Sequence, residues 1–220
     1  MHVNEVRISD GSVALEGNLS LPDHAIALVL FAHGSGSSRH SPRNQFVART
    51  LNNAGLATLL FDLLTPEEEL VDTRTAELRF DIDLLAKRLV HATTWTKQEE
   101  QTTALRIGYF GSSTGGAAAL VAAAELQRDV GAVVSRGGRP DLAGEALPKV
   151  KAPTLLIVGG EDDVVIELNE QARAKMQCEV MLEIVPGATH LFEEPGALEQ
   201  VAKLASDWFI NHIGAKGTAR

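Results

Sequence analysis

A series of short apolar runs constrains the fold of this chain more than any other feature. The runs are continuous rather than alternating in hydrophobicity, and segments of helical character separate them. Continuous runs indicate strands that are covered on both faces, and the helices between them indicate βαβ units of a parallel sheet. The expected strands of this kind cover residues 26–32, 56–61, 104–110, 130–135, 154–158 and 180–185.

Two further strands are expected before this series. Residues 4–9 and 13–19 are joined across Asp10-Gly11-Ser12, whose Asp-Gly pair favours a hairpin. Helices are expected at 42–54, at 114–126, around Leu78, Ile82, Leu85 and Leu89, and after Pro195 around Leu198, Val201, Ala205 and Trp208. The predicted fold class is therefore α/β, with a mostly parallel sheet of about eight strands, an antiparallel N-terminal hairpin and helices on both faces.

Length and composition limit the classes of protein to consider. A chain of 220 residues, 45% of them hydrophobic, suits one domain over 1–220, with 214–220 expected as a frayed tail. We expect no membrane span, because no run of about eighteen apolar residues occurs, and no signal peptide, because residues 1–7 lack its basic region and apolar core. The predicted location is cytoplasmic. A net charge of −9 and 5% aromatic residues argue against nucleic-acid partners.

A G-x-S-x-G motif nominates a nucleophile. Gly111-Ser112-Ser113-Thr114-Gly115 follows an apolar strand and precedes an alanine-rich helix. A serine hydroxyl attacks carbonyl carbon well when a tight strand-to-helix turn holds it out of the sheet, and such a turn needs small neighbours. Gly111 and Gly115 supply them, so we predict Ser113 as the nucleophile.

Two other strand exits supply the partners that a serine nucleophile needs. In a parallel sheet, ligands bind beyond the carboxyl ends of the strands, where His190 and Asp162 are expected with Ser113. Histidine serves as the base, and the acid fixes its tautomer. Asp162 is preferred because it follows the Gly-Gly turn by two residues, and Asp163 is a second candidate. Taken singly, such a histidine or acidic residue is more often an ordinary surface or solvated loop residue, and only their occurrence together with the Ser113 motif favours a catalytic role.

The reaction also requires donors for a developing oxyanion. The backbone N–H of Thr114, directly after the nucleophile, is one candidate. The other is expected in the Gly34-Ser35-Gly36 turn, with Ser35 as first choice and Gly34 as the alternative.

Several arginines fall in the loops expected around this site. Arg39, Arg43 and Arg136 are predicted to bind substrate, and Arg74 and Arg139 lie in the same group of loops. This local positive charge in an acidic protein favours an anionic substrate. The alternative is that these arginines pair with Asp62, Asp72, Asp141 and the acidic run at 67–69.

These motifs together resemble those of the α/β-hydrolase superfamily, in its dienelactone hydrolase-like branch. Phe31-Ala32-His33-Gly34 is similar to the family's oxyanion loop, the Ser113 motif to its nucleophile elbow, Gly160-Glu161-Asp162-Asp163 to its acid turn, and Gly187-Ala188-Thr189-His190 to its histidine loop. Dienelactone hydrolase proper carries a cysteine at the position of Ser113, so dienelactone itself is not implied. The segment 62–76 leaves little room for a large lid.

The predicted function is hydrolysis of a small ester or lactone through an acyl-enzyme, with no metal or other cofactor. The expected partner is a small-molecule ester, which the arginines favour as an anionic one, and the protein is expected as a monomer or homodimer. Two alternatives keep the fold. One is a non-catalytic protein that binds a small ligand or regulates, and the other is an acyltransferase or perhydrolase using the same site.

Overall fold

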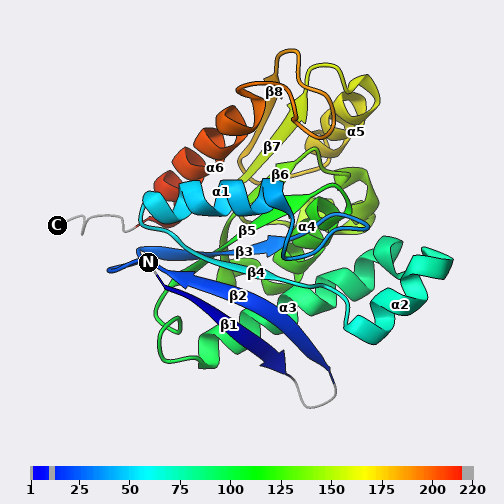
Figure 1. The fold of residues 1–220 in the computed structure, drawn as a ribbon. Coiled ribbons are helices and arrows are strands. Elements are labelled where there is room, and N and C mark those ends of the chain that lie inside the picture. Colours follow the sequence, from blue (N-terminus) through cyan, green and yellow to red (C-terminus); the bar gives the residue numbers. More distant parts are fainter. Residues whose placement is uncertain (1, 10–12, 215–220) are drawn as a thin grey trace.

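The computed structural model describes residues 2–9 and 13–214, and its centre is one eight-stranded sheet (Figure 1). The strand order is β1-β2-β4-β3-β5-β6-β7-β8. β1 pairs with β2 and β2 with β4 in antiparallel fashion, and all other neighbours are parallel. The strands are β1 His2–Ser9, β2 Ala14–Leu21, β3 Ala27–Ala32, β4 Ala57–Phe61, β5 Arg106–Ser112, β6 Val130–Arg136, β7 Thr154–Gly159 and β8 Val180–Val185.

Helices cover both faces of this sheet, which confirms the predicted fold class. α1 (Pro42–Asn53) and α6 (Ala197–Ile213) lie together on one face, while α3 (Ile82–Gln98) and α4 (Thr114–Leu126) lie together on the other (Figure 1). α5 (Asp163–Arg173) joins the second layer through the 3₁₀ segment η3 (Pro140–Lys149). Two buried apolar clusters separate the helical layers from the sheet. Short 3₁₀ segments η1 (Leu78–Phe80) and η2 (Gln127–Asp129) complete these layers.

Helix α2 (Pro66–Thr75) was not predicted, because its acidic run at 67–69 is typical of a solvated loop. Thr65 caps this helix: its hydroxyl accepts from Glu68 N–H, and the Glu68 carboxylate accepts from Thr65 N–H. Acidic side chains in a first turn also favour the positive end of the helix dipole. Glu68 further pairs with Arg88 of α3 at 2.5 Å. The run at 67–69 therefore starts a helix and anchors it to α3.

The expected helix around Leu78 is divided in two. Leu78 lies in η1, and Asp81 caps the start of α3 by accepting from Leu84 N–H at 3.0 Å. The apolar spacing continues across this break, which is why the pattern alone does not reveal it. The hairpin turn predicted at 10–12 and most of the tail predicted at 214–220 lie outside the described residues. Within the described part, no helix is long and apolar enough to cross a bilayer.

Close contact between α4 and the sheet depends on two glycines. A Cβ on Gly115 would lie 2.2 Å from the Ala32 carbonyl oxygen at the end of β3. A Cβ on Gly111 would lie 2.4 Å from the Gly115 carbonyl oxygen. Both contacts are with backbone, which cannot rotate away, so these positions accept no side chain without moving the helix. The start of α4 is thereby held against the carboxyl ends of β3 and β5.

We predict that Gly115→Ala lowers the free energy of unfolding by about 3 kcal/mol, because the added methyl group would clash with backbone. Gly55→Ala is the matched control, since Gly55 has a φ of +83° but no atom within 4 Å of its built Cβ. That control should cost about 1 to 2 kcal/mol, the penalty of a left-handed conformation alone. Urea unfolding measures both, and equal losses for the two variants would contradict this account.

Candidate active site

Ser113 occupies a strained turn between β5 and α4. Its φ of 50° and ψ of −121° are rare for a residue with a side chain. Neighbouring backbone holds the turn: Ser113 N–H donates to the Arg136 carbonyl at 3.3 Å, while the Ser113 carbonyl accepts from Gly116 N–H at 3.0 Å and from Arg139 N–H at 3.1 Å. A strained conformation persists only where its surroundings fix it in this way.

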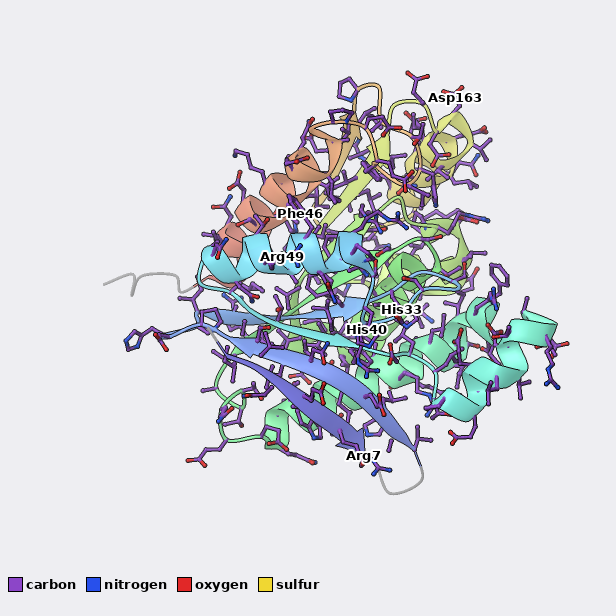
Figure 2. All side chains as sticks on the ribbon, in the orientation of Figure 1. Arg7, His33, His40, Phe46, Arg49 and Asp163 are labelled. Atoms are coloured by element: carbon purple, nitrogen blue, oxygen red, sulfur yellow. The ribbon has the colours of Figure 1, made fainter. Side chains whose placement is uncertain are left out.

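His190 and Asp162 form a hydrogen-bonded pair. His190 Nδ1 lies 2.6 Å from Asp162 Oδ2. Because a carboxylate can only accept, Nδ1 carries the hydrogen and Nε2 of the neutral ring is left with its lone pair. Asp162 precedes α5 without capping it, so its carboxylate is available to the imidazole. Asp163, the other candidate, is exposed in the first turn of α5 and stands at the outer margin of the molecule (Figure 2).

Backbone contacts fix the loops that carry this pair. Glu161 N–H donates to the Ala188 carbonyl at 2.9 Å, which joins the loop after β7 to the loop after β8. The hydroxyl of Thr189 donates to Glu194 at 2.6 Å and closes the second loop on itself. This bond lowers the pKa of the Glu194 carboxyl. These two hydrogen bonds hold the loop after β8, which carries the imidazole of His190.

Ser113 and His190 line one pocket of about 240 Å³ together with Ser35. This volume suits a small acyl group rather than a long chain. No hydrogen bond joins the Ser113 hydroxyl to His190 within the described residues. The two side chains nevertheless open onto the same space.

The residues expected to hold an oxyanion lie at the same pocket. Thr114 is the first residue of α4, and an N–H in that position has no partner within its helix. Gly34 lies against Ser113, since a Cβ built on it would be 3.2 Å from Ser113 Cβ. Ser35 follows in a turn closed by Ser37 N–H donating to the Gly34 carbonyl at 3.1 Å. Thr114 and Ser35 also line one adjoining cavity.

His33 attaches this turn to the sheet, a contact that the sequence analysis did not assign. Its Nδ1 donates to the Gly34 carbonyl at 2.9 Å, and its Nε2 accepts from Leu63 N–H at 3.0 Å. Burial lowers the pKa of His33 below 6.5, although the Gly34 carbonyl opposes this shift. A neutral imidazole is also required by the Leu63 bond, because a protonated ring has no acceptor. The position of His33 directly after β3 was the only sequence signal for such a contact.

The predicted substrate-binding arginines divide into two groups. Arg39 points elsewhere: its guanidinium pairs with Asp62 and with Glu16, the latter at 2.6 Å, and it does not line the Ser113 pocket. Arg139 likewise pairs with Asp141 at 2.8 Å, and Arg74 is exposed on α2. The ion-pairing alternative thus describes Arg39 and Arg139. Arg43 and Arg136 both line the pocket.

Asn44 is a pocket residue that the sequence analysis missed. It lies in the first turn of α1, is only 2% exposed, and its Oδ1 accepts from the Ser112 hydroxyl at 3.1 Å. The only sign of this contact in the sequence was a polar residue, Asn44, near the start of an amphipathic helix. Among the described residues, no three His, Cys, Asp or Glu side chains are grouped as a metal site would need.

Comparison with known proteins identifies the family. A family model described as "Dienelactone hydrolase family" matches residues 17–211. A crystal structure of a dienelactone hydrolase from Anabaena variabilis is 62% identical, with a TM-score of 0.95 over 96% of this chain and 98% of that one. Est1E from Butyrivibrio proteoclasticus is 17% identical, with a TM-score of 0.78 over 94% of this chain and 98% of its own, and shows the fold alone.

A curated relative from Mycobacterium tuberculosis has a different name. It is 59% identical over 213 residues and is called "Putative phosphoribosyl transferase". The match covers 97% of this chain and 47% of that protein. The chain therefore spans about half the length of the curated relatives that it matches.

We predict that the stability contributed by His33 depends on pH. Below pH 6.5 the unfolded chain binds a proton that the buried ring does not, so the free energy of unfolding falls as the pH is lowered. The stability difference between wild type and His33→Gln should therefore shrink by about 1.4 kcal/mol per pH unit below that point. Urea unfolding between pH 5 and 8 tests this, and His40→Gln controls for loss of an exposed imidazole nearby (Figure 2). A constant difference would rule out a buried neutral His33.

Proposed function

We propose that this chain, which belongs to the dienelactone hydrolase family, is a serine hydrolase that cleaves a small ester or lactone through an acyl-enzyme. The observation that carries the proposal is the strained conformation of Ser113 at the same pocket as the His190–Asp162 pair. Strain at a serine between a strand and a helix is the feature of a nucleophile elbow. The family and the dienelactone hydrolase that is 62% identical support a hydrolase in general.

In the first half of the reaction, Ser113 Oγ attacks the acyl carbon while His190 Nε2 takes the hydroxyl proton. Asp162 keeps the ring oriented and stabilises the imidazolium that forms. The Ser113–His190 hydrogen bond that this step needs would form in the substrate complex, because catalytic hydrogen bonds often tighten only there. The tetrahedral intermediate then collapses, and His190 gives its proton to the leaving alkoxide oxygen.

The second half repeats these steps with water. His190 takes a proton from water, whose oxygen attacks the acyl-enzyme, and the proton returns to Ser113 Oγ as the carboxylic acid leaves. In both halves the negative oxygen accepts from the N–H groups of Thr114 and Ser35. The position of Thr114 at the start of α4 adds the favourable end of the helix dipole. Each such donor contributes on the order of 3 kcal/mol to transition-state stabilisation.

The name of the Mycobacterium tuberculosis relative does not displace this proposal. The match covers 47% of that protein's length. The transferase activity in its name can therefore belong to the part of that protein that this chain does not match. The residues gathered at the Ser113 pocket supply a nucleophile and a base for acyl transfer to water. The p-nitrophenyl ester assays below test this assignment directly.

We expect Ser113→Ala to lower kcat for p-nitrophenyl acetate by about 10⁴- to 10⁶-fold, because no other group can form the acyl-enzyme. A fluorophosphonate probe should label the wild type and leave Ser113→Ala unlabelled. Ser9→Ala, on the exposed face of β1, is the control and should be labelled like wild type. Labelling of the Ser113→Ala protein would place the nucleophile elsewhere, and an unlabelled wild type would favour a non-catalytic binding protein.

Two neighbouring carboxylates provide a matched test of the acid. Asp162→Asn should reduce kcat by about 10⁴-fold, because an amide cannot hold His190 in the required tautomer. Asp163→Asn changes the same functional group one residue later, on an exposed side chain, and should stay within about threefold of wild type. Steady-state kinetics on p-nitrophenyl acetate separates them, and equal losses would mean that the His190–Asp162 contact is not used.

A further inference from the structure

An ion pair between α2 and η1 lies next to the Gly34-Ser35-Gly36 turn. Asp72 of α2 is 1% exposed, and its Oδ1 accepts from the backbone N–H of Arg79 at 3.0 Å. Its Oδ2 accepts from Arg79 Nε at 2.6 Å. The Asp72 backbone carbonyl accepts from Arg79 Nη2 at 2.9 Å. These three hydrogen bonds fix the guanidinium group of Arg79 in one orientation.

The remaining nitrogen of this guanidinium lies beside the turn. A Cβ built on Gly36 would be 3.4 Å from Arg79 Nη1, and this nitrogen donates no hydrogen bond within the described part of the chain. Gly36 has a φ of +66°, and Ser37 N–H closes the turn by donating to the Gly34 carbonyl at 3.1 Å. A left-handed third residue is typical of a type II turn. Arg79 therefore contacts the residue on which the shape of the turn depends.

The two ends of the turn are held from different elements. His33 donates to the carbonyl of Gly34, the first residue, and is itself bound to Leu63 N–H. Arg79 lies against Gly36, the third residue. Ser35, the first choice for the second oxyanion donor, stands between these two contacts. Its N–H can keep one direction only if both neighbours keep theirs, because a peptide unit is planar.

Helix α2 connects Arg79 to the body of the protein. Glu68 of α2 pairs with Arg88 of α3 at 2.5 Å. Asp72 follows Glu68 by four residues and so lies on the same face of α2. Since α3 packs against the core, the turn at 34–37 is supported through α2 by a helix that lies far from it in sequence.

From this geometry we infer that Arg79 is a positioning residue: its guanidinium, held by Asp72, supports the turn and so aligns the Ser35 N–H with the oxyanion. The inference rests on the proposed function for the reaction in which that oxyanion forms. Arg79 does not line the pocket of Ser113 and His190, so it acts through the turn and not on the substrate. Donors fixed in advance stabilise a transition state without reorganising during the reaction.

A purely structural role for the ion pair makes a different prediction. The pair would then only join α2 to η1, as its hydrogen bonds already do. Replacing Arg79 would lower the free energy of unfolding, and each folded active site would keep its kcat.

Steady-state kinetics on p-nitrophenyl acetate distinguishes these roles, with active sites counted by fluorophosphonate titration. Arg79→Met should lower kcat by about 10- to 100-fold, less than removal of a donor itself, and should leave KM within about threefold. Arg79→Lys keeps the charge but not the three hydrogen bonds, so it should recover only part of the loss. Arg74→Met is the control, because Arg74 is exposed on α2, and it should keep the wild-type kcat.

Butylboronic acid supplies a second readout, because a boronic acid forms a tetrahedral adduct with an activated serine. Its inhibition constant should rise in Arg79→Met by the factor by which kcat/KM falls. Asp72→Asn leaves the guanidinium in the chain but removes its charged partner, and it should lower kcat in the same direction if Arg79→Met does not fold. Circular dichroism of each variant establishes that it is folded. Equal kcat and equal inhibition constants in Arg79→Met and Arg74→Met would overturn the inference.

Hydrogen exchange separates this inference from the proposed function, because it needs no substrate. The Ser37 N–H that closes the turn should exchange about 10-fold faster in Arg79→Met than in wild type or Arg74→Met. Faster exchange in a protein that hydrolyses no ester would support the contact with the turn and overturn the hydrolase assignment. Ester hydrolysis that falls in Arg79→Met while Ser37 exchange is unchanged would overturn the role of Arg79 in the turn.

Discussion

The backbone conformation at Ser113 is the constraint on which the rest of the site depends. A positive φ at a residue with a side chain is unfavourable by itself, so the turn persists because three hydrogen bonds from its neighbours fix its N–H and carbonyl. Gly111 and Gly115 let α4 begin directly after it, close to the end of β3. This one arrangement sets the direction of the hydroxyl, presents the N–H of Thr114 and brings the Gly34 turn into contact with Ser113.

Charge is distributed unevenly around this elbow. The chain carries a net charge of −9, and most arginines near the site are neutralised by acidic partners. Arg136 has no acidic partner among the described residues, and the end of β6 brings it to a pocket whose described lining has no carboxylate.

The sequence predicted the positions of the strands better than it predicted the contacts between loops. Continuous apolar runs located β3 to β8, and the Asp-Gly hairpin signal located β1 and β2, all to within about two residues at each end. The pattern is strong in β3 to β7 because those strands are buried on both faces. The G-x-S-x-G motif and the positions of the strand ends also predicted that Ser113, Asp162 and His190 lie at the same edge of the sheet. The sequence offered Asp62 and Asp141 as ion-pair partners of these arginines but did not decide between pairing and substrate binding, because Asp62 is 23 residues from Arg39 and only the fold joins them. For the same reason the contacts of Asn44 with Ser112 and of His33 with Leu63 were not assigned.

The contacts that hold residue 113 in place come entirely from the main chain: the N–H and carbonyl groups of 113, 116, 136 and 139 make them, and the serine side chain does not cap α4. The conformation of the turn therefore does not depend on the side-chain oxygen of Ser113. An exchange of oxygen for sulfur at this position would need one substitution and no rearrangement of the turn. Proteins that share this turn can thus evolve different side chains at this position by a single substitution, while the main-chain hydrogen bonds that hold the turn stay the same.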